Sequence, residues 1–393
     1  MLLYIETILV YTLLTLLMCY CAYRSQLSIK KSQLWSALPI VLFTLVFGLR
    51  YGVGIDYNNY LDIYNETKGY TSLASLLDNE RYEIGFSLLV YICHLLHAPV
   101  WVLFTVISFV QILLLYKTFQ KEGNVLIFIY ATLILTGFCM HSLMNILRHE
   151  MAFCIFLYSL KYIQNRQFFK YLICCLFALS FHRSALLIIP LYFIWARHHE
   201  IFHRKWIELI IVLACFISSF LTQWQNILHL FDNVIILLGY ENYIEIADSM
   251  TVNSKIGITR ILNLLINCLI IINSQKIKDY YKSNLFNILY DLFIIGISLG
   301  YVFLGSMMLQ RIIVYFYHTQ FFILAYALYY FYMTRRKDLK IYVQYLVFVL
   351  FILSSYGSFI YNCKRNTGAY VSYFQTDMHK TKDHLRAEML YNK

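Results

Sequence analysis

Charged and polar side chains stand at the mouths of several apolar segments, where a charge is costly unless it faces a protein interior or water. Arg50 and Asp56 lie in the stretch GLRYGVGIDYNNY, Glu83 precedes IGFSLLVYICHLL, and His182 interrupts FALSFHRSALLIIP. An imidazole or a carboxylate can take a proton from a hydroxyl, and an arginine fork matches the oxygens of a phosphate. These residue types therefore predict chemistry between a hydroxyl group and a phosphate-bearing substrate.

Two further arginines belong to this set. Arg148 lies in MNILRHEMAFCIF, and Arg311 begins RIIVYFYHTQFFIL. Arg148 could hold a second phosphate, or it could form an ion pair with Glu150. On the topology that the charge pattern gives, most of the set comes out near the outer face of the membrane: Arg50, Asp56, Glu83, His182 and Arg311.

Each of these residues also has a purely structural interpretation. Arg50 can end a helix by reaching toward lipid headgroups, with Asp56 as its ion-pair partner. A histidine between apolar segments is often held by a backbone carbonyl, which leaves His182 open between a base and a structural residue. The glycines around Arg50 permit unusual backbone conformations and the close approach of a ligand.

Two other patterns imitate known sites and fit them poorly. His199 and His203 have the i, i+4 spacing of helical metal ligands, but with His198 and Glu200 they occupy a basic loop where solvation is favoured. The acidic triplet 78–80 imitates that of nucleotide-sugar transferases, but no nucleotide-binding domain accompanies it. We predict no metal and no cofactor.

The composition is that of an integral membrane protein. Hydrophobic residues make up 60% of the 393-residue chain and charged residues 13%, and the mean hydropathy is +0.61. Crossing a hydrocarbon layer of roughly 30 Å takes about 20 helical residues, and lipid leaves no water for backbone amides. We predict an all-α, polytopic transmembrane helical bundle with about 11–13 spans, some of them short, broken or re-entrant. The expected spans are 2–23, 34–49, 84–98, 99–117, 124–140, 147–164, 168–181, 184–196, 206–223, 260–273, 285–305, 311–333 and 340–361.

The charge pattern orients these spans. The net charge of +11 resides in short loops, which the positive-inside rule assigns to the cytoplasm, so nucleic acid is not an expected partner. Two longer connections, 50–83 and 223–259, are expected to face outward. Because the connection 50–83 is expected outside and the basic loop after 164 inside, the chain must cross the membrane an odd number of times between them. The expected spans give four crossings. One segment within 84–98 or 124–164 should therefore be re-entrant, merged with its neighbour or not a span.

The expected organisation is one helical domain over 1–361, followed by a loose polar tail over 362–393. The ten cysteines form no CxxC pair and mostly lie inside spans. They are interpreted as small apolar packing residues without a disulfide or metal role.

Four stretches form a recognisable set: RYGVGIDYNNY at 50–60, YEIGF at 82–86, NILRHEMA at 145–152 and FALSFHRSAL at 177–186. In order and spacing they resemble the EpsG family of polytopic bacterial polysaccharide polymerases, which are Wzy-like enzymes. The family pattern has Gln where this chain has His149, and commonly Pro where it has Ile84. In the second half of the chain, Arg311 and Tyr315 look like the late Arg-x-x-x-Tyr of such polymerases. The matching positions in the first half are Arg50, Tyr51, Gly54, Asp56, Tyr57, Tyr60, Glu83, Gly85, Phe86, Asn145, Arg148, Ala152, Phe181, His182, Ser184 and Ala185.

The resemblance implies a GT-C-like bundle that polymerises oligosaccharide repeat units carried on undecaprenyl pyrophosphate. The growing glycan would pass to the hydroxyl of an incoming lipid-linked repeat at the extracytoplasmic face of the bacterial inner membrane, without metal or nucleotide. Besides the lipid bilayer and the lipid-linked oligosaccharides, a chain-length regulator and a flippase of the same pathway are the implied partners.

The resemblance also implies roles for individual residues. His182 is expected as the base, with Glu83 or Asp56 second. The cations expected on the pyrophosphate are Arg50, Arg148 and Arg311. The residues expected on sugars are Tyr51, Tyr57, Tyr60 and Tyr315, together with the outer connection 223–259.

Two other functions stay open as alternatives. A flippase for lipid-linked sugars also needs broken helices and buried arginines, although no duplicated half with matching breaks is visible. An O-antigen ligase would use the same donor and differ in its acceptor. A scaffold without catalytic activity fits the outer-face arginines and histidine least well.

Overall fold

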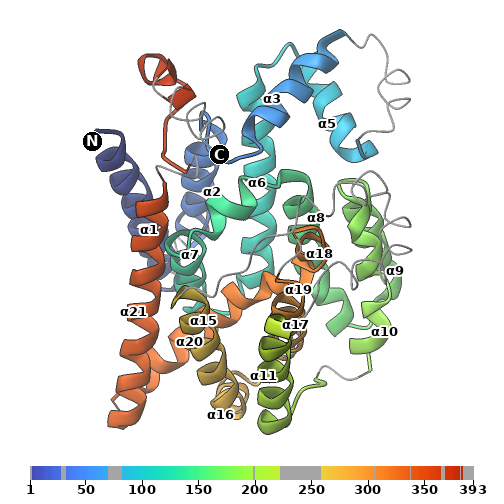
Figure 1. Cartoon of the computed structure of the whole chain (residues 1–393). Helices are drawn as coiled ribbons and strands as arrows, with labels where there is room; N and C mark the ends of the chain where they lie inside the picture. Colours follow the sequence, from blue (N-terminus) through green and yellow to red (C-terminus); the bar gives the residue numbers. More distant parts are fainter. Residues whose placement is uncertain are drawn as a thin grey trace. The chain divides into compact units, whose positions relative to one another are not determined.

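The structure of the protein is a computed structural model that describes residues 2–27, 32–69, 82–197, 200–221, 258–304, 307–336, 338–363, 368–380 and 382–383. Within these ranges the regular structure is helical, with one isolated antiparallel bridge between Arg50 and Ser372 (Figure 1). The expected all-α, polytopic fold is confirmed. Most of the connection 223–259, the triplet 78–80, and His198 and His199 lie outside the described residues.

The chain divides into two compact units. Unit 1 holds residues 1–158, 177–182 and 352–393. Within it α1 packs against α2 and α7, and α2 packs against α6. Its elements are α1 (Leu2–Leu27), α2 (Ser32–Gly48), α3 (Tyr57–Glu66), η1 (Thr67–Gly69), α5 (Ile84–Leu95), α6 (Val100–Phe119), α7 (Val125–Leu135), η2 (Cys139–Leu143) and most of α8 (Leu147–Gln164).

Unit 2 holds residues 159–176 and 183–351. Its centre is α17, which packs against α11, α19 and α20 and has 78% of its most apolar window buried. Its elements are most of α9 (Phe168–Leu179), η3 (Arg183–Ile188), α10 (Leu191–Trp195), α11 (Lys205–Leu221), α15 (Ile258–Ile272), α16 (Ser274–Tyr281), α17 (Asn284–Val302), α18 (Met307–Ile312), α19 (Val314–Tyr317), α20 (Thr319–Thr334) and the start of α21 (Leu339–Asn362).

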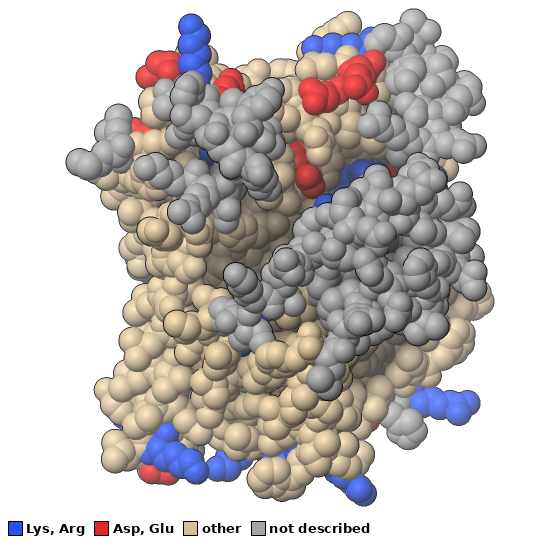
Figure 2. All heavy atoms as spheres, in the orientation of Figure 1, with Lys and Arg blue, Asp and Glu red and all other residues tan. Residues whose placement is uncertain are grey.

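Long apolar helices alternate with short ones. By length and composition, 4 described helices could cross a membrane, namely α1, α6, α17 and α21, or 5 if α15 and α16, bent by 58°, count as one span. On the face shown in Figure 2, broad areas carry no charged side chain, and Lys and Arg appear near both its lower and its upper edge, with Asp and Glu beside those at the upper edge. This distribution fits a polytopic membrane protein.

Several expected spans are broken into pieces. The span expected over 124–140 ends at Leu135, because Gly137 has a φ of +75° and the chain continues as the π-helix η2. The span expected over 311–333 is divided among α18, α19 and α20. The segments 168–181 and 184–196, expected to be short, form α9, η3 and α10.

The helix α5 is the best candidate for the expected segment that does not cross the membrane. Near its start, the Phe86 ring lies 5.9 Å from the Tyr60 ring of α3. Near its end, His94 Nε2 lies 3.0 Å from the Thr67 hydroxyl, and the His94 ring lies 4.4 Å from that of Tyr64. Both ends of α5 thus contact the segment 57–67, so α5 runs beside it and is not counted as a crossing. With α5 left out, three of the expected spans remain between the first connection and the basic loop after 164, which is the odd number that the charge pattern predicts; of these three, α6 is long and apolar enough to cross a membrane.

The polar C-terminal segment is not a loose tail throughout. Residues 368–383, apart from 381, are described and belong to unit 1. The Tyr51 amide donates to the Val371 carbonyl at 2.8 Å, and the Tyr373 amide donates to the Leu49 carbonyl at 2.7 Å. The segment is therefore paired with the chain that follows α2.

Candidate functional site

Arg50 is the most deeply buried of the predicted site residues, with an exposure of 0%. Its guanidinium donates to the Phe47 carbonyl and, at 3.3 Å, to the Met144 carbonyl, and it lies 4.6 Å from the centre of the Phe104 ring. Burial lowers the pKa of Arg50 to about 10, so the group stays charged at neutral pH. Arg50 ties the end of α2 to the turn after η2 and does not reach the surface.

The turn after Arg50 docks onto the same region. Gly54 has a φ of +101°, a conformation that favours glycine, and a Cβ there would lie 3.1 Å from the Met144 carbonyl oxygen. The Asp56 amide donates to Asn145 Oδ1 at 3.0 Å, and Asp56 Oδ1 accepts from Asn59 Nδ2 at 3.4 Å. The motif at 50–60 and the motif at 145–152 therefore form one structure.

Arg148 and Glu83 form an ion pair at the start of α8. Arg148 Nη1 lies 2.5 Å from Glu83 Oε2, with 25% of the arginine side chain and 11% of the glutamate side chain exposed. Arg148 also hydrogen-bonds the Tyr60 side chain and lies 5.4 Å from the Tyr82 ring. The expected pairing of Arg148 with Glu150 is not the one observed. Arg148 is a partly accessible cation with one carboxylate beside it.

Gly85 brings the fourth motif to this cluster. Its amide donates to the Ser180 carbonyl at 2.7 Å, and a Cβ at position 85 would lie 2.4 Å from Ser180 Oγ and 2.8 Å from Ser180 O. Only a residue without a side chain allows the first turn of α5 to approach the end of α9 so closely. This contact places the segment 177–182 beside Glu83.

His182 lies face to face with His149. The two imidazole rings are 4.1 Å apart between centroids and 9° from parallel. His149 is buried, whereas His182 is partly exposed. His149, which has no predicted role, is thus the direct neighbour of the predicted base.

The predicted sugar-binding tyrosines differ in accessibility. Tyr57 and Tyr60 are 2% and 6% exposed, and burial raises the pKa of both hydroxyls, which keeps them protonated as donors. The Tyr57 ring stacks on Phe104 at 5.0 Å. Tyr51 is partly exposed. Tyr51 is therefore the member of this group whose ring best suits contact with a ligand.

Arg311 and Tyr315 belong to unit 2. Arg311 ends α18 and is exposed, whereas Tyr315 of α19 is buried. The Tyr315 hydroxyl lies 3.1 Å from Ser184 Oγ in η3. Tyr315 of the late Arg-x-x-x-Tyr therefore contacts the second half of the FHRSA stretch, within unit 2. Unit 1 holds the other predicted catalytic and phosphate-binding residues, which are Arg50, Asp56, Glu83, Arg148 and His182.

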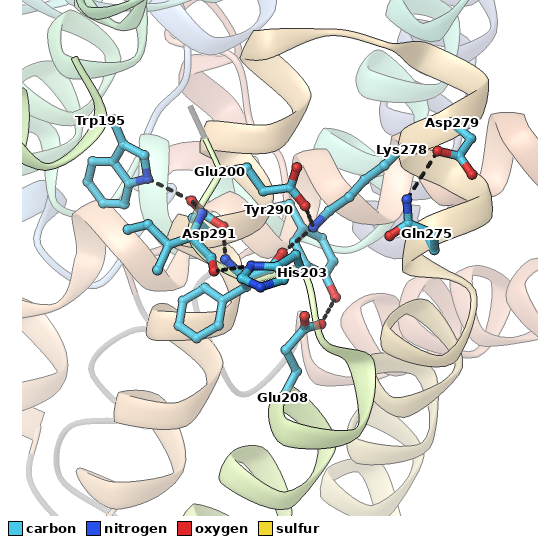
Figure 3. Close-up of polar contacts among 11 residues, drawn as sticks. Trp195, Glu200, His203, Glu208, Gln275, Lys278, Asp279, Tyr290 and Asp291 are labelled. Carbon is cyan, nitrogen blue, oxygen red and sulfur yellow. Dashed lines mark hydrogen bonds and ion pairs between the residues drawn. The ribbon is translucent and has the colours of Figure 1, made fainter. Parts of the chain in front are cut away.

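The basic loop around 200 takes part in a buried polar network of unit 2 (Figure 3). Asp291 of α17 accepts hydrogen bonds from Trp195 Nε1 at 2.7 Å, from the Ile201 amide at 2.7 Å and from the Phe202 amide at 3.0 Å. Lys278 donates to Glu200 at 2.9 Å. The sequence does contain a signal for this network, because Asp291 is an acidic residue inside the apolar run ILYDLFII. The network was not among the predictions from the sequence.

The metal pattern in that loop is only partly described. His203 Nδ1 lies 3.0 Å from the Ile201 carbonyl oxygen, and Glu200 pairs with Lys278. Across the described ranges, no three His, Cys, Asp or Glu side chains gather in the way that a metal site requires. The network therefore fixes the loop between α10 and α11.

Comparison with known proteins agrees with the motifs. The sequence pattern that defines the EpsG family matches residues 33–374, which include the four N-terminal motifs and the late arginine. No curated protein and no solved structure matches the chain. With most of its length covered by the match, this chain belongs to the EpsG family of Wzy-like polysaccharide polymerases.

Proposed function

We propose that the protein polymerises oligosaccharide repeat units linked to undecaprenyl pyrophosphate, at the extracytoplasmic face of the bacterial inner membrane. Membership of the EpsG family supports a polysaccharide polymerase in general. The observation that carries the finer proposal is the cluster in unit 1, where the Arg148–Glu83 ion pair and the His149–His182 stack are joined through the Gly85–Ser180 contact.

The proposed reaction is a transfer of the growing glycan. The bond between the anomeric carbon of the donor and the pyrophosphate oxygen breaks, and the lipid pyrophosphate leaves with the bonding electrons. The acceptor hydroxyl oxygen forms the new glycosidic bond, and its proton passes to His182. A neutral imidazole suits this role because its unperturbed titration lies near neutral pH. Neither metal nor nucleotide takes part.

The arginines stabilise the departing pyrophosphate in this proposal. Arg148 is partly exposed and lies beside Glu83 and the segment that carries His182, so in this proposal it contacts the phosphate oxygens directly. Arg50, fully buried behind the turn, supplies a fixed positive charge and holds that turn in place. Arg311 is exposed in unit 2 and is proposed as a second phosphate ligand. Prearranged charges of this kind are a large source of rate enhancement.

The remaining groups orient the sugars. Glu83 or Asp56 either activates the acceptor hydroxyl or orients the base. Tyr51 offers an aromatic face and a hydroxyl to a sugar ring. Tyr60 bonds Arg148 and so links sugar binding to the phosphate-binding cation. Tyr57 is buried against the Phe104 ring and supports the turn within unit 1, whereas Tyr315 is buried in unit 2 beside Ser184.

The test uses the complete protein in liposomes. The substrate is the single lipid-linked repeat purified from cells that lack the gene. The expected result is a ladder of longer glycans, with one undecaprenyl pyrophosphate released for each new bond. In the mutant cells, single repeats should accumulate on the outer side of the membrane. Accumulation on the cytoplasmic side would indicate a flippase, and full-length polymer not joined to lipid A core would indicate a ligase; either would contradict the proposal.

A further inference from the structure

The segment 368–383, which we call the strap, is joined to the candidate site by its backbone. It pairs with the chain around Arg50 through the Arg50–Ser372 bridge and the two hydrogen bonds that flank it. The Gly368 carbonyl also accepts from the Tyr11 hydroxyl at 3.0 Å. In Figure 1 the strap is the red segment beyond α21, at the same end of unit 1 as the N-terminus. Its path is thus fixed against unit 1 at several points.

Side chains of the strap enclose Tyr51. The His379 ring lies 3.5 Å from the Tyr51 ring and is 4° from parallel to it. The Tyr51 hydroxyl donates to Asp383 at 3.0 Å. Lys382 is buried and donates to the Ala369 carbonyl, and its side chain covers Gly52 so closely that a Cβ there would lie 3.0 Å from Lys382 Cγ.

These side chains lie beyond the region that identifies the family, because the EpsG match ends at residue 374. Membership of the family therefore assigns them no role. Their contacts are nonetheless with Tyr51 and Gly52, which belong to the first motif. His379, Lys382 and Asp383 thus contact the first motif from outside the matched range, whereas the backbone pairing of the strap lies within it.

We propose that the strap is part of the glycan-binding surface and that His379 and Asp383 are positioning residues for Tyr51. An isolated tyrosine ring on a partly exposed turn can rotate, and ordering it on binding costs conformational entropy. The His379 stack fixes the plane of the ring, and Asp383 fixes its hydroxyl. The ring edge and the oxygen lone pairs of Tyr51 are then presented in one orientation to a sugar of the lipid-linked repeat. This inference rests on the proposed function.

The role predicts a change in binding without a change in chemistry. With the purified lipid-linked repeat as substrate, His379→Ala should raise KM by about five- to tenfold and leave kcat within about twofold, since an aromatic pair contributes roughly that much. His379→Phe keeps a flat ring over Tyr51 and should restore the wild-type KM. Lys380→Ala, an exposed neighbour in the strap, is the matched control and should behave as wild type.

A double-mutant cycle isolates the second contact. Tyr51→Phe and Asp383→Asn each remove or weaken the same hydrogen bond, so their effects on KM should be strongly non-additive. Additive effects, an unchanged KM in His379→Ala, or an equal loss of kcat and kcat/KM would overturn the inference. A gain of activity in His379→Ala would also overturn it, because the strap would then be a cover over Tyr51.

The two proposals fail in different ways. If the wild-type protein forms no polymer from the lipid-linked repeat, the proposed function is wrong, and the inference about the strap, which rests on it, is overturned with it. If the wild type polymerises and the strap variants match it in KM, only the inference about the strap is wrong.

Discussion

At the scale of single residues, the pairing of His182 with His149 bears most directly on chemistry. The stacked rings place a buried imidazole against a partly exposed one. The buried ring is shielded from water and loses more on becoming charged. The stack holds the plane of the His182 ring, and this ring is the partly exposed one of the two.

His182→Ala should therefore abolish polymerisation while the protein remains in the membrane. A general base contributes about 100-fold or more to rate, so gels should show single capped repeats in place of ladders. His203→Ala is the control, because His203 is exposed and lies in the loop of unit 2. Wild-type ladders from His182→Ala, at normal protein level, would remove His182 from the mechanism.

Arg50, a predicted pyrophosphate cation, is held by the protein itself. Its contacts are two backbone carbonyls and the Phe104 ring. A planar guanidinium satisfies both carbonyls at once and lies flat on an aromatic ring, which a lysine ammonium cannot do.

Arg50→Lys should accordingly lower both stability and activity. Leaving one buried carbonyl without a donor costs about 1–3 kcal/mol, which should appear as a lower melting temperature of the purified protein and weaker ladders. Arg24→Lys, at a more exposed arginine that lies 5.0 Å over Trp35, should have little effect. Unchanged stability in Arg50→Lys would show that the two carbonyl contacts contribute little.

At the scale of elements, the closest approach in the site is that of α5 to the end of α9. The Gly85–Ser180 contact joins the helix that carries Glu83 at its start to the segment that carries His182. An error of about 1 Å in the relative position of two catalytic groups can lower a rate by about 100-fold.

Gly85→Ala should therefore reduce activity at least about tenfold, since the added methyl group forces the two segments apart. Ladder length and initial rate in liposomes measure the effect. Gly357→Ala, in α21, is the matched substitution because a Cβ there meets nothing within 4 Å. Equal activity of the two variants would mean that the site tolerates separation of α5 from α9.

At the scale of the whole molecule, composition and motif order predict much of what is observed. The all-helical membrane fold follows from the apolar runs, and the first three N-terminal motifs lie in unit 1 together with residues 177–182 of the fourth. Hydropathy could not predict that α5 lies along α3, that Gly137 breaks a span, or that α18, α19 and α20 are separate, because these depend on contacts between segments.

The strap and the buried state of Arg50 were also beyond sequence interpretation. A polar segment such as 368–383 looks solvated when it is considered alone, and its partners near Arg50 and Tyr51 lie more than 300 residues away. The division into two units likewise depends on contacts between segments that lie far apart in the chain, and a local sequence pattern does not reveal such contacts.

The topology gives a prediction for the complete protein. Cysteines introduced at the exposed positions Asn59 and Lys380 should react with a membrane-impermeant maleimide in intact spheroplasts. A cysteine at the exposed position Lys340 should react only after permeabilisation, because it lies at the start of α21, next to the basic residues 335–337. The parent protein, labelled in parallel, corrects for native thiols. Labelling of positions 59 and 380 from opposite sides would contradict the pairing of the strap with the first motif.

The burial of Arg50 has a consequence for how the protein should respond to salt. None of its contacts in the described part of the chain is with a carboxylate, so its charge is offset by carbonyl dipoles alone. Mobile ions screen an exposed charge over about 8–10 Å but cannot surround one inside the protein. Attraction of an anionic lipid headgroup toward the turn above Arg50 should therefore persist at ionic strengths that abolish ordinary surface adsorption.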